Sequence, residues 1–247
     1  MFTGDYPKEM RERVGSRLPT FTAEQSASLM RAAPHLLGVN HYSSSMVAAV
    51  GDGVCMRYRN GSSAFKWREN AHYLDQCLVE FKDPKRTGPL PNPHLKWLSS
   101  KPEGMRRVLQ WMSRRYAHSM ARSGSGIVVA ESGVGLDGGS NGDPRDSGTL
   151  TVDVNDDAKI EYLSAYWSEA HAAMVHDGVD LRGIFHWSFL DNLEWGSGYS
   201  AHFGMVHVDH SDPALPRTPK KSAAWHQKVV EQHGFVPAGG EVELPGL

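Results

Sequence analysis

Three short apolar runs punctuate the polar background of this chain and predict β-strands at roughly 36 to 42, 127 to 131 and 182 to 190. The run at 127 to 131 contains Ile127, Val128 and Val129 without a polar interruption. An uninterrupted run of β-branched residues favours a strand that is buried on both faces, as in a parallel sheet.

Apolar residues recur at intervals of three and four between about Asp156 and Asp177, which predicts a long amphipathic helix that Gly178 ends. This helix leads directly into the predicted strand at 182 to 190. The strand at 127 to 131, the helix and the strand at 182 to 190 therefore form one predicted βαβ unit. The expected buried stripe consists of Ile160, Leu163, Tyr166, Trp167, Ala170 and Met174.

Three further helices are predicted, with less regular patterns. Thr22 and Gln25 fit a capping box that opens a helix to about Ala33. An apolar stripe near 108 to 116 predicts a helix against the sheet, and another helix is expected from about Pro219 to His233. Residues 43 to 100 are rich in proline and glycine turn signals and predict one long irregular connection.

The composition is that of a globular protein. Hydrophobic residues make up 40%, charged residues 22%, and the formal net charge is -2, which argues against a nucleic-acid partner. No apolar run of about 18 residues occurs, so no membrane span is expected. No His-Glu-x-x-His motif occurs among the 13 histidines, so no metal site and no cofactor are predicted. Two cysteines define no disulfide framework and leave the compartment open.

Two predicted strands deliver a carboxylate at their carboxyl ends. Glu131 ends the run at 127 to 131, and Glu194 lies in the aromatic segment from Trp187 to Trp195. Indole faces cover the apolar faces of a sugar ring, and carboxylate and amide oxygens accept its hydroxyls. The aromatic segment is therefore either a carbohydrate platform or the edge of a Trp-rich core. Because βα-barrel enzymes keep their chemistry at the carboxyl ends of strands, we expect one shared site.

Several segments, in order along the chain, resemble family 1 glycoside hydrolases, the β-glucosidase family. The similarity covers almost the whole chain, and the motifs of this sequence that carry it are Gly4-Asp5-Tyr6-Pro7, Val39-Asn40-His41-Tyr42, Pro102-Glu103-Gly104-Met105, Val129-Ala130-Glu131-Ser132-Gly133, Trp187 to Trp195, Phe203-Gly204, and Lys220 with Ser222 and Trp225. The resemblance implies an α/β fold: a partial (β/α)8 TIM barrel, roughly its C-terminal three βα units, in a single domain over residues 1 to 247.

The resemblance also implies retaining hydrolysis of a β-glycoside or oligosaccharide, in which one carboxylate attacks the anomeric carbon and a second carboxylic acid protonates the leaving oxygen. By this resemblance Glu131 is the nucleophile and Tyr42 orients it. The substrate-binding residues that it implies are Asn40, Trp187, Glu194, Trp195 and Phe203.

The family's acid/base glutamate lies in an Asn-Glu-Pro segment, and no Asn-Glu-Pro occurs in this sequence. Two functions therefore remain open. The chain is either a β-glucosidase-like hydrolase that lacks its acid/base half and is inactive alone, or a non-catalytic fragment that binds sugar weakly. A missing N-terminal half is the partner that the first function requires.

The chain departs from the family pattern at Ala130 and Ser132, which flank Glu131, and at His202, where the family usually has Arg. The loss of side-chain hydrogen bonds beside Glu131 puts its orientation in question. Residues 133 to 138 match the G-x-G-x-x-G dinucleotide pattern, but the Gly/Asp-rich segment that follows is incompatible with the helix that the pattern needs. We expect a Gly/Asp loop there instead.

Overall fold

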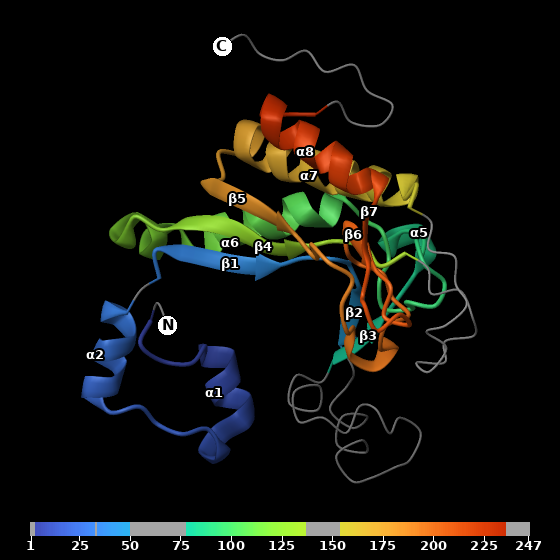
Figure 1. Cartoon of the computed structure of the whole chain (residues 1–247). Helices are drawn as coiled ribbons and strands as arrows, with labels where there is room; N and C mark the ends of the chain where they lie inside the picture. Colours follow the sequence, from blue (N-terminus) through green and yellow to red (C-terminus); the bar gives the residue numbers. More distant parts are fainter. Residues whose placement is uncertain (1–2, 33, 50–77, 137–153, 236–247) are drawn as a thin grey trace, which may run out of the picture.

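A computed structural model describes residues 3–32, 34–49, 78–136 and 154–235. Its centre is a three-stranded parallel sheet in the order β1-β4-β5 (Figure 1). Strand β1 spans Leu36–Asn40, β4 spans Gly126–Ser132 and β5 spans Leu181–His186. All three predicted strands are therefore present and lie in one sheet.

The predicted strand at 182 to 190 extends too far. Strand β5 ends at His186, and the chain then turns away, leaving only an isolated bridge between Leu190 and Val206. The strand at 36 to 42 likewise ends at Asn40. In both cases a single backbone hydrogen bond to β4 follows the last strand residue, from His41 N–H to the Glu131 carbonyl and from Trp187 N–H to the Ser132 carbonyl, and the regular pairing ends there.

Two long helices cover one face of the sheet (Figure 1). Helix α6 spans Glu103–Ser123 and helix α7 spans Asp157–Asp177. Each ends at a glycine in the left-handed conformation, Gly124 and Gly178, where a side chain would be strained. Their apolar faces bury the core with Ile127 and Val129 of β4. The predicted stripe of α7 is largely correct, but Met174 is exposed and Ala173 takes its place in the core.

The other face of the sheet is uncovered within the described chain, so burial of β4 on both faces is wrong for these residues. Ala130 is exposed, and Val128 is only half-buried. A side chain at Gly38 or Gly183 would touch Val128, so these positions share one face. Phe185 is 60% exposed. In this arrangement an apolar surface lacks the second layer that a parallel sheet normally has.

The connection at 43 to 100 is not wholly irregular. Its described part contains an antiparallel pair, β2 (Met46–Ala49) and β3 (Leu78–Phe81), followed by the short helix α5 (Pro84–Thr87). Strands of four residues that pair across a distance in sequence leave too little periodicity to be predicted. The expected Gly/Asp loop after Leu136 lies outside the described residues.

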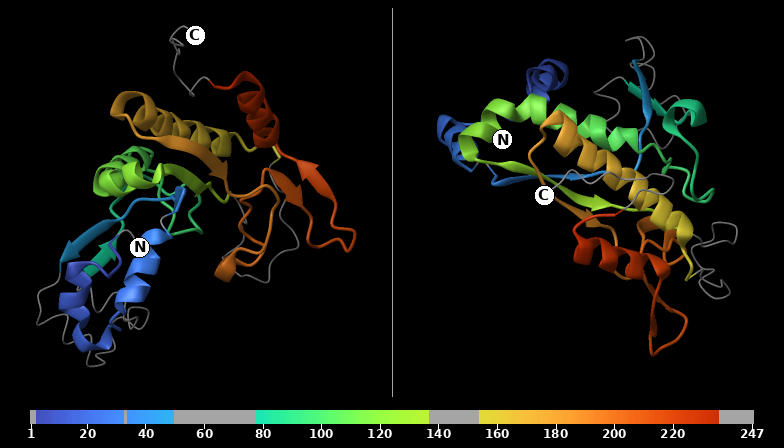
Figure 2. Two further views of the ribbon diagram at one scale, coloured as in Figure 1. Left: turned by 90° about the vertical axis from the view of Figure 1, so that its left-hand side faces the viewer. Right: turned by 90° about the horizontal axis from the view of Figure 1, so that it is seen from above.

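The ends of the chain add smaller elements around the sheet (Figure 2). The N-terminal part holds α1 (Lys8–Val14), η1 (Gly15–Arg17) and α2 (Ala23–Arg31), and Thr22 and Gln25 form the predicted capping box. The C-terminal part holds η3 (Trp195–Ser197), the antiparallel pair β6 (Val206–Val208) and β7 (Arg217–Pro219), and α8 (Lys221–Gln232). None of the described helices is long and apolar enough to cross a membrane.

Candidate active site

Glu131 and Tyr42 meet at the carboxyl ends of β4 and β1. The Tyr42 hydroxyl donates a hydrogen bond of 2.6 Å to Oε2 of Glu131. The backbone of this corner is fixed as well, since the His41 N–H donates to the Glu131 carbonyl at 2.9 Å and Asn40 is in register with Glu131. The parallel pairing of β1 and β4 therefore places the phenol beside the carboxylate, as the sequence predicts.

Tyr42 is held from behind by helix α7. The hydroxyls of Tyr162 and Tyr166 donate to the Tyr42 carbonyl at 2.5 and 3.3 Å. Burial, followed by the hydrogen bond to Glu131, raises the pKa of the Tyr42 phenol far above its ordinary value. The phenol thus stays protonated and acts as a fixed donor to the carboxylate of Glu131.

Glu194 and Trp187 form a second pair beyond the end of β5. The Trp187 indole donates from Nε1 to Oε1 of Glu194 at 2.7 Å. The Glu194 backbone is fixed by its N–H, which donates to the Gly198 carbonyl at 2.7 Å. One carboxylate oxygen is therefore committed to the indole.

The charge of Glu131 acts on Glu194. Burial and then the charge of Glu131 raise the pKa of Glu194, while the hydrogen bond from Trp187 opposes the rise. The charge of Glu194 also contributes to the raised pKa of Tyr42. Glu131 therefore acts on Glu194, and Glu194 acts on Tyr42, across the carboxyl ends of the sheet.

The remaining predicted ligands take different positions. Asn40 is exposed at the end of β1, beside Glu131. Phe203 is 2% exposed and its ring packs edge-on against Tyr42, so it is a buried packing partner of Tyr42. Trp195 is 93% exposed and extends into solvent from η3. The sheet brings Asn40, Tyr42 and Glu131 together, whereas the Trp195 indole is almost wholly exposed.

Trp97 belongs to this cluster and was missed by sequence reasoning. Its ring packs at 5.8 Å from Tyr42 and stacks at 6.5 Å on Phe203, and it is half-exposed. Trp97 comes from the connection at 43 to 100, where no periodic pattern marks it. A solitary tryptophan between prolines in a predicted loop was the only available signal.

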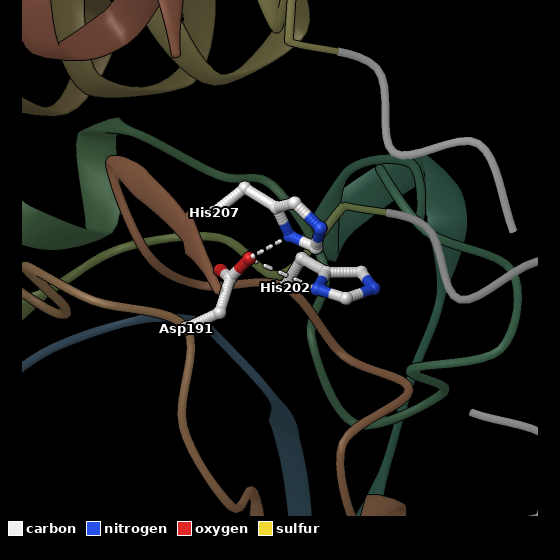
Figure 3. Close-up of side chains that lie close together, drawn as sticks. All are labelled: Asp191, His202 and His207. Atoms are coloured by element: carbon white, nitrogen blue, oxygen red, sulfur yellow. Dashed lines mark hydrogen bonds and ion pairs between the residues drawn. The ribbon is translucent and has the colours of Figure 1, made fainter. Parts of the chain in front are cut away.

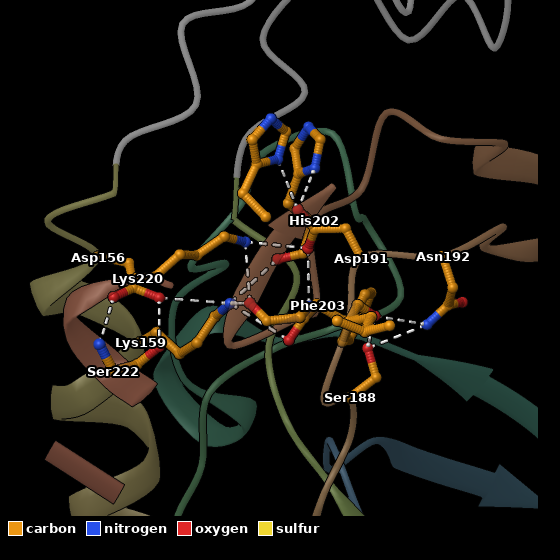
Figure 4. Close-up of polar contacts among 12 residues, drawn as sticks. Asp156, Lys159, Ser188, Asp191, Asn192, His202, Phe203, Lys220 and Ser222 are labelled. Atoms are coloured by element: carbon orange, nitrogen blue, oxygen red, sulfur yellow. Dashed lines mark hydrogen bonds and ion pairs between the residues drawn. The ribbon is translucent and has the colours of Figure 1, made fainter. Parts of the chain in front are cut away.

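The loop that carries Glu194 is anchored by Asp191, which is 4% exposed (Figures 3 and 4). Its Oδ2 lies 3.1 Å from His202 Nδ1 and 2.9 Å from His207 Nδ1, and its Oδ1 accepts from Gly204 N–H and Lys220 Nζ. Burial alone would raise the pKa of Asp191, but these hydrogen bonds and the Lys220 charge outweigh burial and hold the pKa far below its ordinary value.

A second buried carboxylate joins this loop to the helices (Figure 4). Asp156, just before α7, accepts from the backbone and hydroxyl of Ser222 at 2.8 and 2.6 Å. The Lys159 ammonium lies 3.5 Å from Asp156 and donates to the carbonyls of His202, Phe203 and Gly204. Asn192 donates to the Ser188 hydroxyl and the Leu190 carbonyl. Buried polar contacts thus hold the loop, together with the core packing of Ala201 and Phe203.

This chain has parallel βα units with two carboxylates, Glu131 and Glu194, among aromatic side chains at their carboxyl ends, which places it in the class of barrel glycoside hydrolases. More specifically, the chain belongs to glycosyl hydrolase family 1, whose model matches residues 1–235. The structure is accordingly part of a (β/α)8 barrel.

Similar proteins are β-glucosidases. Beta-glucosidase 42 of Arabidopsis thaliana is 32% identical over 233 residues, which cover 94% of this chain and 42% of that protein. Raucaffricine-O-beta-D-glucosidase of Rauvolfia serpentina is 33% identical over 225 residues, which cover 90% of this chain and 37% of that protein. The chain therefore spans well under half the length of these curated relatives.

Solved structures of β-glucosidases are also similar to this chain. Beta-glucosidase 2 of the fungus Trichoderma reesei, in complex with Tris, superposes with a TM-score of 0.71 at 29% identity and covers 96% of this chain and 45% of its own. A family 1 β-glucosidase from the fungus Humicola insolens, in complex with glucose, superposes with a TM-score of 0.70 at 29% identity, over 94% and 43% of the two chains.

Proposed function

We propose that this chain supplies the nucleophile half of a retaining β-glycosidase. Glu131 attacks the anomeric carbon of a β-glucoside-like substrate and forms a covalent glycosyl-enzyme, which water then hydrolyses. The observation that supports this best is the 2.6 Å hydrogen bond from Tyr42 to Glu131. A phenol that stays protonated keeps the carboxylate in one orientation and stabilises its charged, nucleophilic form.

The sugar-binding roles rest on the second pair. Oε1 of Glu194 accepts from Trp187 at 2.7 Å, which leaves Oε2 to accept sugar hydroxyls. We assign Asn40 and Trp97 to the wall of the pocket, Phe203 to its support and Trp195 to an exposed indole that stacks only when a sugar is bound. The raised pKa of Glu194 fits a carboxylate that gains hydrogen-bond donors from a ligand.

The acid/base step requires a group that this sequence does not supply at the family's motif, because Asn-Glu-Pro is absent from the 247 residues. Loss of a general acid costs about 10²–10⁴-fold with ordinary leaving groups. An incomplete pocket costs more, since the substrate is not held in a reactive geometry. We therefore propose that the isolated chain has no appreciable activity on aryl β-glucosides.

Reconstitution tests this function. The chain is co-refolded with the N-terminal part of Arabidopsis beta-glucosidase 42 that it does not cover, and hydrolysis of an aryl β-glucoside is measured. We expect turnover from the pair and from neither half alone. Glu131→Gln should abolish it, while Glu161→Gln, an exposed change on α7, should leave it intact. Robust turnover by the chain alone would overturn the proposal and point to Glu194 or another carboxylate as the acid.

A further inference from the structure

We propose that Asp191, His202 and His207 form a binding site for a zinc ion, which would link the loop that carries Glu194 to β6. Figure 3 shows both imidazoles directing a ring nitrogen at the Asp191 carboxylate. One oxygen and two nitrogens lie within 4.8 Å of one another. The three residues come from the loop after β5, the loop before β6, and β6 itself.

The distances suit a small tetrahedral ion. Oδ2 of Asp191 lies 3.1 Å from Nδ1 of His202 and 2.9 Å from Nδ1 of His207. Ligand atoms about 2.0–2.1 Å from a tetrahedral zinc lie about 3.3 Å apart. The two histidine nitrogens lie within 4.8 Å of each other, so an ion could enter as they close toward this separation and lose the two ring N–H protons that now bridge to the carboxylate.

The donor set selects the ion. Two imidazole nitrogens and one carboxylate oxygen suit Zn²⁺, whereas Mg²⁺ prefers an octahedral shell of oxygens. Three protein ligands leave one coordination position for water. The site is also ordered in advance, because Asp191 and His202 are buried and Oδ1 of Asp191 is independently held by Gly204 N–H and Lys220.

One charge opposes binding. The Lys220 ammonium lies 2.9 Å from Oδ1 of Asp191 and repels a cation on Oδ2. Lys220 also donates to the Gly204 carbonyl at 2.9 Å, so it keeps an acceptor when the ion draws on the carboxylate. The repulsion lowers the affinity, but it leaves the three ligand atoms free to converge.

The sequence has no local motif for this site, since the ligands are spread from 191 to 207 without the spacing of a zinc-binding helix. The expectation of no metal rested on the absence of His-Glu-x-x-His. Only the folding of the loop brings Asp191 next to the two histidines. One of them, His202, stands where the family usually has Arg.

Calorimetric titration of the full, metal-stripped chain with ZnCl₂ tests the proposal. We expect saturable one-to-one binding, with no comparable binding of Mg²⁺. His202→Asn and His207→Asn keep an N–H donor near the Nδ1 position, so they preserve the hydrogen bond to Asp191 but remove the ligand. Each should weaken zinc binding about tenfold or more. His118→Asn, an exposed change on α6, is the matched control and should have no effect.

X-ray absorption at the zinc edge on the unmutated chain gives an answer that does not depend on how the variants fold. We expect first-shell nitrogen and oxygen scattering with the outer-shell signature of two imidazoles. Binding that is unchanged in both asparagine variants, a first shell dominated by sulfur from Cys55 or Cys77, or no binding at all would each overturn the site.

Discussion

At the scale of single residues, the candidate site is defined by the neighbouring groups that hold two carboxylates, Glu131 and Glu194. The sequence predicts Glu131, Tyr42 and Glu194 because each stands at or just beyond the end of a strand within a recognisable motif. It does not predict Trp97, or the links from Asp191 to His202 and His207. Those contacts depend on how loops of irregular conformation fold back over the sheet, which no periodicity records.

Removing the Tyr42 hydroxyl should slow the reconstituted pair. A hydrogen bond to a charged group contributes about 1.5–3 kcal/mol, so Tyr42→Phe should lower kcat/KM about 10–150-fold. Tyr6→Phe, which keeps the ring stacked on Phe21, is the control. Steady-state kinetics on an aryl β-glucoside measure both, and an unchanged kcat/KM for Tyr42→Phe would show that Glu131 needs no orienting donor.

Glu194→Gln should stabilise the fold at neutral pH. The folded-state pKa of Glu194 is raised, so the folded protein gains stability from this group below the ordinary pKa of glutamate. That stability is lost as the pH rises and Glu194 ionises. The gain should be small, because the hydrogen bond from Trp187 opposes the rise in the pKa of Glu194. Urea midpoints should rise at pH 7 and match the unmutated chain near pH 4. A lower midpoint at pH 7 would contradict the repulsion from Glu131.

His41 should make the fold sensitive to mild acid. Burial lowers its pKa to about 4 from 6.5, so the unfolded chain binds a proton over that window while the folded chain does not. Stability is therefore lost as pH falls from about 6.5 to about 4, by about 3 kcal/mol. His41→Phe, which keeps the ring contact with Tyr166, should flatten this part of the urea-midpoint profile. An equally steep profile in the variant would assign the loss to other groups.

At the scale of elements, long periodic segments were predictable and short pairings were not. Helix α7 begins and ends within a residue of its prediction, because twenty-one residues of helical spacing and a terminal glycine agree. Strand β5 was predicted too long, since a run of apolar residues does not show where its ladder partner ends. The pair β2 and β3 has only four residues on each side, and its pairing is set by tertiary contacts.

Two adjacent aspartates at the start of α7 allow a buried ion pair to be compared with an exposed one. Asp156 is buried against Lys159 and Ser222, so Asp156→Ala removes a buried ion pair and leaves the backbone N–H and hydroxyl of Ser222 without their acceptor, which should cost about 3–5 kcal/mol. Asp157 pairs with Lys221 on the surface, and Asp157→Ala should cost under about 1 kcal/mol. Urea unfolding compares them. Equal losses would mean that the anchor between α7 and α8 is not structural.

At the scale of the whole molecule, the sheet is open. Strands β1 and β5 form its edges within the described chain, and its second face carries exposed apolar side chains that include Leu36 and Phe185. In a closed barrel both edges are paired and the inner face is filled. Closure cannot be predicted from a run of three βα units, because it depends on strands that lie elsewhere in the relatives.

The isolated chain should therefore associate. Unpaired edges and an uncovered apolar face favour oligomers or aggregates over a monomer. Light scattering coupled to size exclusion should show species larger than the monomer, and the co-refolded N-terminal half should convert them to a one-to-one complex. A monodisperse monomer with a sharp thermal transition would contradict the view that this surface needs a second layer.

The most direct test of the central claim is to trap the nucleophile. In the reconstituted pair, an activated 2-deoxy-2-fluoroglucoside with a dinitrophenyl leaving group needs little acid assistance, and its fluorine slows hydrolysis of the glycosyl-enzyme. Peptide mapping by mass spectrometry should then find one fluoroglucosyl group on Glu131 and none in Glu131→Gln. Labelling of a different carboxylate, Glu194 included, or no labelling by a pair that still turns over aryl glucosides, would contradict the assignment.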